Sequence, residues 1–185
     1  MVKYFKISLL LLCFLTRTSQ SDDGSGYHNP LVANEFVEMI CNQTSSYSAC
    51  TDAFYSDSRI PSADQYTVAY IAVSMTYTGA TNTKKLIEGA LRRPTSQFEA
   101  ELFQRCCSEY DEAISLITSA YTDVNDETFS DLARLASTAS VAVDNCLAAL
   151  GNDQTLPAMV PQCVHGDKIL LEACEAIGSL YCGEC

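Results

Sequence analysis

The sequence predicts an all-α protein: an up-down four-helix bundle preceded by a short N-terminal helical hairpin and stabilised by disulfides. Three observations support this prediction. Apolar residues recur at steps of three and four along four long segments between residues 62 and 182. No segment shows the sustained alternation of a strand, and no hairpin-turn dipeptide separates two β-branched runs. The connections are short, which makes consecutive helices antiparallel neighbours.

Residues 1–21 have the features of a secretory signal peptide. Lys3 and Lys6 give a positive start, and 7–15 is an apolar run. Ser19 and Ser21 place small side chains at the −3 and −1 positions of a cleavage site. A membrane anchor would need about 20 apolar residues, which this run does not supply. We therefore expect a secreted, extracellular protein with no membrane association.

The charge of the chain excludes some classes of partner. The net charge is −12, and removing residues 1–21 would take away three basic residues and no acidic one, giving −15. Such a protein is repelled by nucleic acid and by anionic membranes, and it attracts basic proteins. The remaining 164 residues suffice for one domain with a core of its own, 29–185, which follows a flexible arm at 22–28.

Residues 29–58 are expected to form the helical hairpin. Asn29 is a suitable cap and Pro30 a suitable first residue for a helix that ends near Cys41. A second short helix is expected at about 47–55. Cys41 and Cys50 enclose the turn between the two helices, so a local disulfide is feasible there.

The bundle is expected at 62–182, and capping boxes mark the start of its first two helices. Ser62 with Gln65 begins the first helix, and Ser96 with Glu99 begins the second after the break at Pro94. The residues predicted to face inward are Tyr66, Tyr70, Val73, Tyr77, Ala80, Ile87 and Leu91 in the first helix, and Leu102, Cys106, Tyr110, Ala113, Ile117 and Ala120 in the second.

The third and fourth bundle helices follow a short turn predicted at 121–125. The third has the most regular stripe, and Gly151 occupies a C-cap position at its end. The fourth is expected at about 167–181, after a loop that contains Pro157 and Pro161. The inward residues are Phe129, Leu132, Ala136, Ala139, Val143, Cys146 and Leu150 in the third helix, and Leu170, Ala173, Ile177 and Leu180 in the fourth.

Nine cysteines remain beyond residue 21, at positions 41, 50, 106, 107, 146, 163, 174, 182 and 185. In an oxidising compartment most of them should pair, and the odd number leaves at least one thiol free or bonded to another molecule. Cys106 and Cys146 lie on inward stripes of adjacent antiparallel helices, so a cross-helix disulfide is feasible. Cys107 is rotated by about 100° from Cys106 and is the worse partner.

Three motifs in order resemble the plant invertase/pectin methylesterase inhibitor domain over about residues 30–182. The first resembles C-x-x-T-x-Y-P-x-x-C, although here the Tyr comes one place late and the Pro is missing. The second resembles D-C-x-x-x-Y-x-x-A, with Arg in place of the acidic residue. The third resembles a Ser nine residues before the last cysteine, followed by Leu. The matching residues are Cys41, Thr44, Tyr47 and Cys50, then Arg105, Cys106, Tyr110 and Ala113, then Ser137, Cys146 and Leu147.

The resemblance implies a non-catalytic inhibitor of a cell-wall carbohydrate-active enzyme, secreted to the apoplast or cell wall. It also implies two disulfides, Cys41–Cys50 and Cys106–Cys146, and a one-to-one complex in which the inhibitor covers the active-site cleft of its target. The acidic charge and the absence of the Pro-Lys-Phe tripeptide of invertase-type members favour pectin methylesterase as the target. Acid invertase is the alternative.

Five cysteines are additional to this pattern: Cys107, Cys163, Cys174, Cys182 and Cys185. Some are expected to fix the last helix to the bundle, and a terminal one could instead link a homodimer. A zinc site of Cys163, His165, Cys182 and Cys185 is disfavoured because secretion favours disulfides, so no metal is expected. The C-x-x-C at the end lacks the following helix that a redox motif needs.

Two further function classes have some support in the sequence or need to be excluded by it, a ligand-binding module and an enzyme. The adjacent pair Cys106-Cys107 resembles that of plant lipid-transfer proteins, so a secreted lipid- or small-ligand-binding module is an alternative, although the later C-x-C is missing. An enzyme is disfavoured because neither His28 nor His165 has a nucleophile pattern nearby, and no cofactor is expected. Asn42 begins an N-glycosylation sequon inside the hairpin turn.

Overall fold

The computed structural model of the protein describes residues 30–92, 94, 96–151 and 159–182, and every regular element in these ranges is a helix. The all-α prediction is therefore confirmed. The signal peptide expected at 1–21 and the arm expected at 22–28 lie outside the described residues. The elements are α2 (Pro30–Cys41), α3 (Tyr47–Tyr55), the 3-10 helix η1 (Ile60–Ser62), α4 (Gln65–Leu91), α5 (Gln97–Asn125), α6 (Leu132–Leu150) and α7 (Met159–Cys182).

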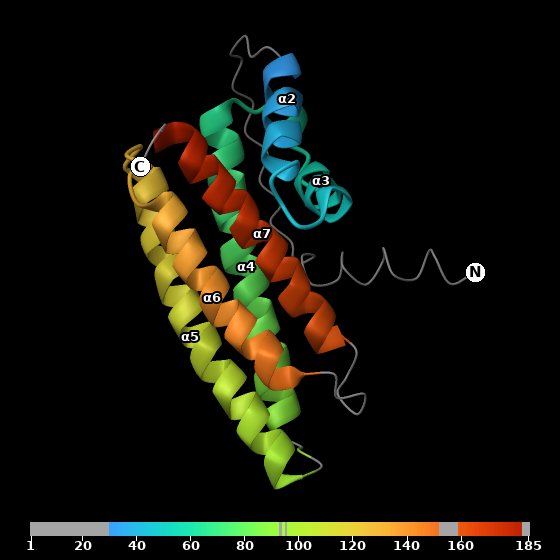
Figure 1. The fold of residues 1–185 in the computed structure, drawn as a ribbon. Coiled ribbons are helices and arrows are strands. Elements are labelled where there is room, and N and C mark those ends of the chain that lie inside the picture. The colour runs from blue at the N-terminus through green and yellow to red at the C-terminus, as the bar shows by residue number, and fades with distance from the viewer. Residues whose placement is uncertain (1–29, 93, 95, 152–158, 183–185) are drawn as a thin grey trace, which may run out of the picture.

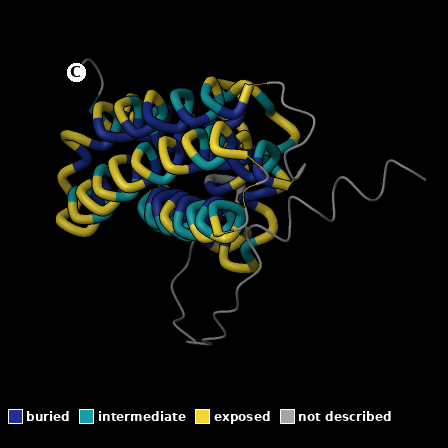
Figure 2. The backbone as a smooth tube through the Cα atoms, turned by 90° about the horizontal axis from the view of Figure 1, so that it is seen from below, coloured by how far each residue is buried: buried dark blue, intermediate teal, exposed yellow. Residues whose placement is uncertain are grey.

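The four long helices form the predicted up-down bundle (Figure 1). Helix α5 packs between α4 and α6, and α7 closes the bundle by packing between α6 and α4. Each helix turns buried residues toward the shared axis and exposed residues outward (Figure 2). None of the helices described here is long and apolar enough to cross a membrane.

Helix α6 has the face that the sequence predicts. Each residue of its predicted stripe is buried, from Phe129 to Leu150. Helix α7 approaches α6 very closely at Gly178, where an added Cβ would lie 2.3 Å from the backbone nitrogen of Ala133. Any side chain at residue 178 would therefore force these two helices apart.

Helix α4 buries a broader face than the predicted stripe. Tyr77 is 41% exposed, so its inward assignment is wrong, whereas Tyr66 and Tyr70 are partly buried and pack against the edge of the core. Helix α4 contacts α5, α7 and the hairpin, and therefore more than one of its faces is covered. The residues buried along it are Val68, Ala69, Ile71, Ala72, Val73, Thr76, Gly79, Ala80, Thr83 and Ile87.

Two helix ends differ from the prediction. Helix α4 is capped by Asp64, whose side chain accepts a hydrogen bond from the Thr67 amide at 2.7 Å, whereas Ser62 lies in η1. Aspartate is as good a cap as serine, so the nearer of two suitable residues is used. Helix α5 begins as predicted, with Ser96 accepting from the Glu99 amide at 3.1 Å. It runs on to Asn125, through the segment predicted as a turn.

The turn between α5 and α6 is organised by Asp123. Its carboxylate accepts hydrogen bonds from the Thr128 hydroxyl and, at 3.0 Å, from the Asp131 amide. These contacts hold a backbone in which Glu127 and Phe129 have φ values of 55° and 53°. Positive φ is unfavourable for residues other than glycine, so Asp123 supports a strained turn.

Helix α7 begins at Met159, about two turns before the predicted start. Pro161 lies in its first turn, where a proline is tolerated because its missing N–H would have no partner within the helix. The earlier start places Asp167 inside the helix and buries it. At the other end Leu180 is 38% exposed, so its inward assignment is wrong.

The hairpin packs against α4 and α7, on the side of the bundle away from α5 (Figure 1). An aromatic cluster joins it to the end of the bundle. Phe129 stacks on Tyr181 with ring centres 3.9 Å apart, and Phe36 of α2 meets Tyr181 edge-on at 6.2 Å. Tyr66 of α4 meets Phe129 edge-on at 6.1 Å. The hairpin, the start of α4, the α5–α6 turn and the end of α7 are thereby fixed to one another.

Candidate functional site

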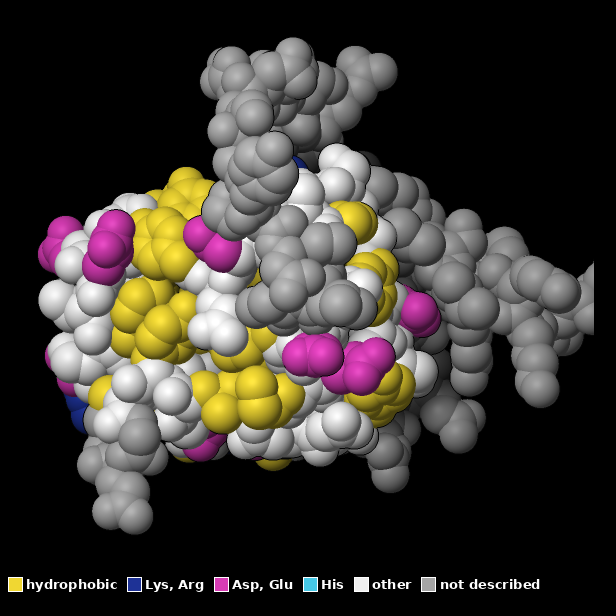
Figure 3. All heavy atoms as spheres, turned by 90° about the horizontal axis from the view of Figure 1, so that it is seen from above, with side chains coloured by type: hydrophobic (Ala, Val, Ile, Leu, Met, Phe, Trp, Pro, Cys, Tyr) yellow, Lys and Arg dark blue, Asp and Glu magenta, His cyan; other side chains and the backbone are white. Residues whose placement is uncertain are grey.

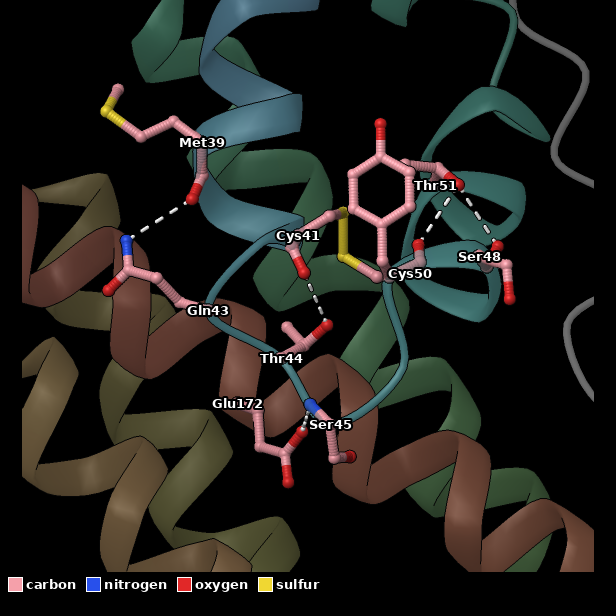
Figure 4. Close-up of a disulfide and its surroundings, with 10 residues drawn as sticks. Met39, Cys41, Gln43, Thr44, Ser45, Ser48, Cys50, Thr51 and Glu172 are labelled. Atoms are coloured by element: carbon pink, nitrogen blue, oxygen red, sulfur yellow. Dashed lines mark hydrogen bonds between the residues drawn. A yellow bond between two sulfur atoms is a disulfide. The ribbon is translucent and has the colours of Figure 1, made fainter.

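The hairpin turn is closed by a disulfide between Cys41 and Cys50, whose Cα atoms are 5.5 Å apart. Both cysteines are fully buried, whereas Asn42 and Gln43 are exposed. The Thr44 hydroxyl donates to the Cys41 carbonyl at 2.9 Å (Figure 4). The sequon asparagine therefore lies on an exposed loop whose backbone is fixed at both ends.

One contact ties this loop directly to the bundle. The Ser45 amide donates to a carboxylate oxygen of Glu172 on α7 at 2.7 Å, across 127 residues of sequence. Figure 4 shows the Glu172 side chain reaching from α7 to the loop. Hydrogen bonds to an ionised acceptor are stronger than neutral ones, so this contact positions the hairpin on α7.

A Glu172→Ala variant is expected to loosen the hairpin turn without unfolding the bundle. Loss of one partly exposed, charge-assisted hydrogen bond should cost about 1 kcal/mol locally. Amide hydrogen exchange at Ser45 should accelerate about five-fold, since 1.4 kcal/mol corresponds to a factor of ten. Glu175→Ala on the same helix is the matched control. Equal protection of Ser45 in both variants would contradict a positioning role for Glu172.

The second disulfide joins Cys106 of α5 to Cys146 of α6. Their Cα atoms are 4.5 Å apart, and both residues are fully buried. Among the described cysteines Cys107 and Cys174 are free. Cys163 and Cys182 both have partners. Cys185 lies outside the described residues, so the expectation that a terminal cysteine links two copies stays a prediction.

The free thiols have different surroundings. Cys107 is partly exposed, and burial together with Glu88 raises the pKa of its thiol. Cys174 is buried on α7, where burial raises its thiol pKa to about 12 and the Thr76 hydroxyl lies 3.4 Å from its sulfur. A raised pKa suppresses the thiolate, which is the reactive form of cysteine. Neither residue has the electropositive surroundings of a catalytic cysteine.

Two carboxyl groups are buried among the described residues, Glu99 at the start of α5 and Asp167 in the middle of the core. Asp167 of α7 is 1% exposed and accepts a hydrogen bond from the Tyr110 hydroxyl of α5 at 2.7 Å. Burial raises the pKa of Asp167 to about 7, although the hydroxyls of Thr83 and Tyr110 act in the opposite direction. The same burial and the nearby Asp167 raise the pKa of Tyr110. Asp167 of α7, Tyr110 of α5 and Thr83 of α4 thus bring together polar groups from three bundle helices.

The described residues do not form a metal-binding cluster of histidine, cysteine, aspartate or glutamate. His165 is exposed on α7. Asp167 is enclosed by the bundle, so a substrate could not reach it without opening the core. The chemistry available to the described part of the molecule is therefore that of its surface.

Helices α5 and α6 form a bundle surface on the side away from the hairpin, which packs on α4 and α7. We define the α5–α6 face as the exposed residues Glu101, Gln104, Arg105, Ser108, Asp111, Glu112, Ser115, Thr118, Ser119 and Thr122 of α5, with Arg134, Thr138, Val141 and Ala148 of α6. Val141 is 59% exposed, which makes it an accessible apolar anchor. The 29 residues of α5 give a helix about 43 Å long.

The α5–α6 face has a strongly acidic helix at its centre. Helix α5 carries six acidic residues and one basic residue, Arg105. Asp111 accepts from Lys84 of α4 at 2.5 Å, and Glu109 lies 3.9 Å from Arg105. Acidic side chains also lie beside hydrophobic ones at the end of the bundle shown in Figure 3, where Lys and Arg are scarce. These surfaces favour a partner with basic patches.

Comparison with known proteins places this architecture in context. Residues 35–170 match the family model described as plant invertase/pectin methylesterase inhibitor. A segment of 94 residues is 31% identical to a protein of Arabidopsis thaliana named cell wall / vacuolar inhibitor of fructosidase 2. That segment covers 50% of this chain and 52% of the relative, so the match spans about half the length of the curated protein.

Two crystal structures of pectin methylesterase inhibitors share the fold. A mutant form from Arabidopsis superimposes with a TM-score of 0.72 at 19% identity, covering 78% of this chain and 95% of that one. A second inhibitor, from Arabidopsis thaliana, gives a TM-score of 0.62 at 18% identity and covers 79% and 95% of the two chains. At these identities the likeness establishes the arrangement of helices.

Proposed function

The chain belongs to the plant invertase/pectin methylesterase inhibitor family, whose members are inhibitor proteins and not enzymes, and on this basis we propose that it inhibits a pectin methylesterase. The proposed mechanism is the binding of one inhibitor to one enzyme, with the bundle surface covering the active-site cleft. The observation that carries this proposal is the α5–α6 face, which is long, exposed and clear of the hairpin, and whose helix α5 carries six acidic residues.

A rigid surface is what inhibition by occlusion requires. The α5–α6 face lies on two helices that are joined through the core by Cys106–Cys146. A surface that is already ordered loses little conformational entropy on binding, so more of the contact energy appears as affinity. The inhibitor need supply no reacting group, because excluding the substrate from the cleft is sufficient.

The net charge of −12 and the acidic residues of α5 support a basic target, and this favours a pectin methylesterase with a basic rim around its cleft. Acid invertase is the second candidate, because the partial relative is named an inhibitor of fructosidase. We further propose that residues 1–21 direct the protein out of the cell, where either target would be met. The name of the partial relative mentions both the cell wall and the vacuole. Of these two compartments, we propose the cell wall for this protein.

The direct test measures the residual activity of a pectin methylesterase and of a cell-wall invertase with the oxidised protein between pH 4 and pH 7. We expect saturable inhibition of the pectin methylesterase at a one-to-one ratio. Inhibition of invertase alone would support the alternative target. Activity of both enzymes that stays unchanged at micromolar inhibitor would contradict the proposal and favour a ligand-binding module, which displacement of a hydrophobic dye by lipids would reveal.

A Val141→Arg substitution on α6 is expected to weaken inhibition at least ten-fold. It replaces an exposed apolar anchor with a long cationic side chain, which costs complementarity and repels a basic partner. Tyr77→Arg on α4 is the matched control, because it adds the same charge to an exposed position on the diagonally opposite helix. Both variants should unfold like the wild type. Equal inhibition by the two variants would exclude the α5–α6 face as the contact surface.

A further inference from the structure

The hairpin presents a second outward surface that the proposed inhibitory face does not include. Tyr47, Thr51 and Tyr55 follow one another at steps of four along α3 and so share one side of that helix. Asn34 and Glu38 of α2 adjoin this stripe: the Tyr55 hydroxyl lies 3.2 Å from Asn34 Oδ1. We call these five residues the hairpin face.

The two tyrosines of the hairpin face are available to a partner. Each is 45% exposed, whereas the opposite side of α3 buries Cys50, Ala53 and Phe54. Glu38 lies one helical turn from Asn34 on α2, so it shares the side of α2 that the Tyr55 hydroxyl contacts. Partial burial, Glu38 and Tyr47 raise the pKa of the Tyr55 phenol. The surface therefore combines two aromatic rings with a carboxylate and an amide.

The charge of the hairpin is uniformly negative. Residues 30–58 contain four acidic residues, Glu35, Glu38, Asp52 and Asp57, and neither lysine nor arginine. Asp57 pairs with Arg59 at 2.7 Å. The other three are exposed, and within the described chain they form no ion pair. A cation that reaches the hairpin face meets an unneutralised carboxylate beside aromatic rings.

We propose that the hairpin face binds an arginine-bearing segment of a partner protein. A guanidinium group can stack on a tyrosine ring and donate to a carboxylate at the same time, which an ammonium or an apolar side chain does less well. The negative charge disfavours nucleic acid and anionic membranes. It also disfavours a second copy of this chain, since a two-fold contact would bring like charges together.

The covalent closure of the hairpin makes this surface a preformed one. The Cys41–Cys50 disulfide and the contact between Ser45 and Glu172 fix α3 relative to α2 and α7. The rings of Tyr47 and Tyr55 are therefore held apart at a set spacing along one helix. A partner segment with two arginines can engage both rings without reordering the hairpin, which lowers the entropic cost of binding.

The test uses the isotope-labelled, oxidised protein and a blocked peptide of sequence Gly-Arg-Gly-Arg-Gly at low salt. We expect a dissociation constant on the order of 1 mM, with the largest amide shifts at residues 34–38 and 47–55. A peptide with citrulline in place of arginine keeps the shape and loses the charge, and it should bind at least five-fold more weakly. Addition of salt should weaken binding of the arginine peptide.

Variants locate the site. Combined Tyr47→Ala and Tyr55→Ala substitutions should weaken peptide binding at least five-fold, and Glu38→Gln about three-fold. Tyr77→Ala on α4 and Glu112→Gln on α5 are matched controls that should change it less than 1.5-fold. Circular dichroism verifies that each variant is folded. If a variant unfolds, the peptide-induced amide shifts of the wild-type protein still locate the binding site.

Three results would overturn the inference. The first is peptide-induced amide shifts centred on α5, and the second is binding of the citrulline peptide with equal affinity. The third is amide shifts of the hairpin face that grow with protein concentration when no peptide is present, which would indicate self-association. No enzyme is present in the experiment, so its outcome is independent of whether the protein inhibits a pectin methylesterase.

Discussion

Between pH 4 and pH 7 the wild-type protein is expected to lose about 3 kcal/mol of unfolding free energy relative to an Asp167→Asn variant. The pKa of Asp167 is raised from 3.8 in the unfolded chain to about 7 in the bundle. Between these values the folded state keeps a proton that the unfolded state has released. The contribution of Asp167 to the free energy of unfolding is therefore fully present below about pH 4, falls as the pH rises, and levels off above about pH 7.

The asparagine variant removes this titration and keeps the shape of the site. Its amide oxygen can still accept the hydrogen bond from the Tyr110 hydroxyl. The measurement is urea unfolding of both proteins at half-unit steps from pH 4 to pH 7.5. The two curves should lie close together at the acid end and diverge toward neutral pH, with the variant the more stable at pH 7.

Glu112→Gln is the control for this experiment, because Glu112 is an exposed acidic residue on α5. Its stability curve should run parallel to that of the wild type. A parallel curve for Asp167→Asn as well would show that the buried carboxyl titrates near its ordinary pKa, and would contradict the prediction. If the prediction holds, an acidic compartment keeps the bundle in its more stable form.

The sequence predicted the helices best where apolar spacing is regular and the caps are clear. The α6 stripe is buried along its whole length because its alanines and valines face two neighbouring helices at close range. The hairpin helix at 47–55 has the predicted bounds. In each case a local pattern and the tertiary contacts favour the same answer, which is the condition for a reliable prediction from sequence.

The errors arise where tertiary contacts outweigh local patterns. Tyr66, Tyr70 and Tyr77 fit a helical stripe by spacing, yet they lie at the edge of the core or outside it, and small residues that the stripe left out, such as Ala69 and Ala72, are fully buried. Tyrosine can remain at the edge, with its ring packed and its hydroxyl near water. The inward stripe of α4 is therefore set by how closely its neighbours approach, which apolar spacing alone does not show.

Asp167 was missed for a related reason. An aspartate after a proline-containing loop is typical of a helix start, so the local sequence pattern predicts a helix that begins at Asp167. The available signal was the apolar series Val160, Val164 and Leu171, which continues through residue 167 at helical spacing. An acidic residue inside such a series points to a buried, hydrogen-bonded carboxyl. The choice of surface for a partner had no comparable signal, because exposure depends on where the hairpin packs.

Replacing both Cys106 and Cys146 with alanine is expected to lower the free energy of unfolding by about 4 kcal/mol. The disulfide spans 40 residues of sequence, and in the loop-entropy description a longer closed loop gives greater stabilisation. The same change at Cys41 and Cys50, which are separated by nine residues, should cost about 2.7 kcal/mol. Urea unfolding under oxidising conditions measures both, and fully reduced wild-type protein should unfold more easily than either variant.

The single variant Cys106→Ala tests whether the disulfide to Cys146 needs a cysteine at position 106 or can form from the neighbouring position. It leaves Cys107 one residue away, with Cys146 still facing the core from α6. A step of one residue turns the side chain by about 100° around the helix, so Cys107 should not reach Cys146 while α5 is folded. Mass mapping without reduction should therefore find Cys146 unlinked to Cys107. A Cys107–Cys146 bond with wild-type stability would show that α5 can rotate in the bundle, and that the inward stripe does not select Cys106.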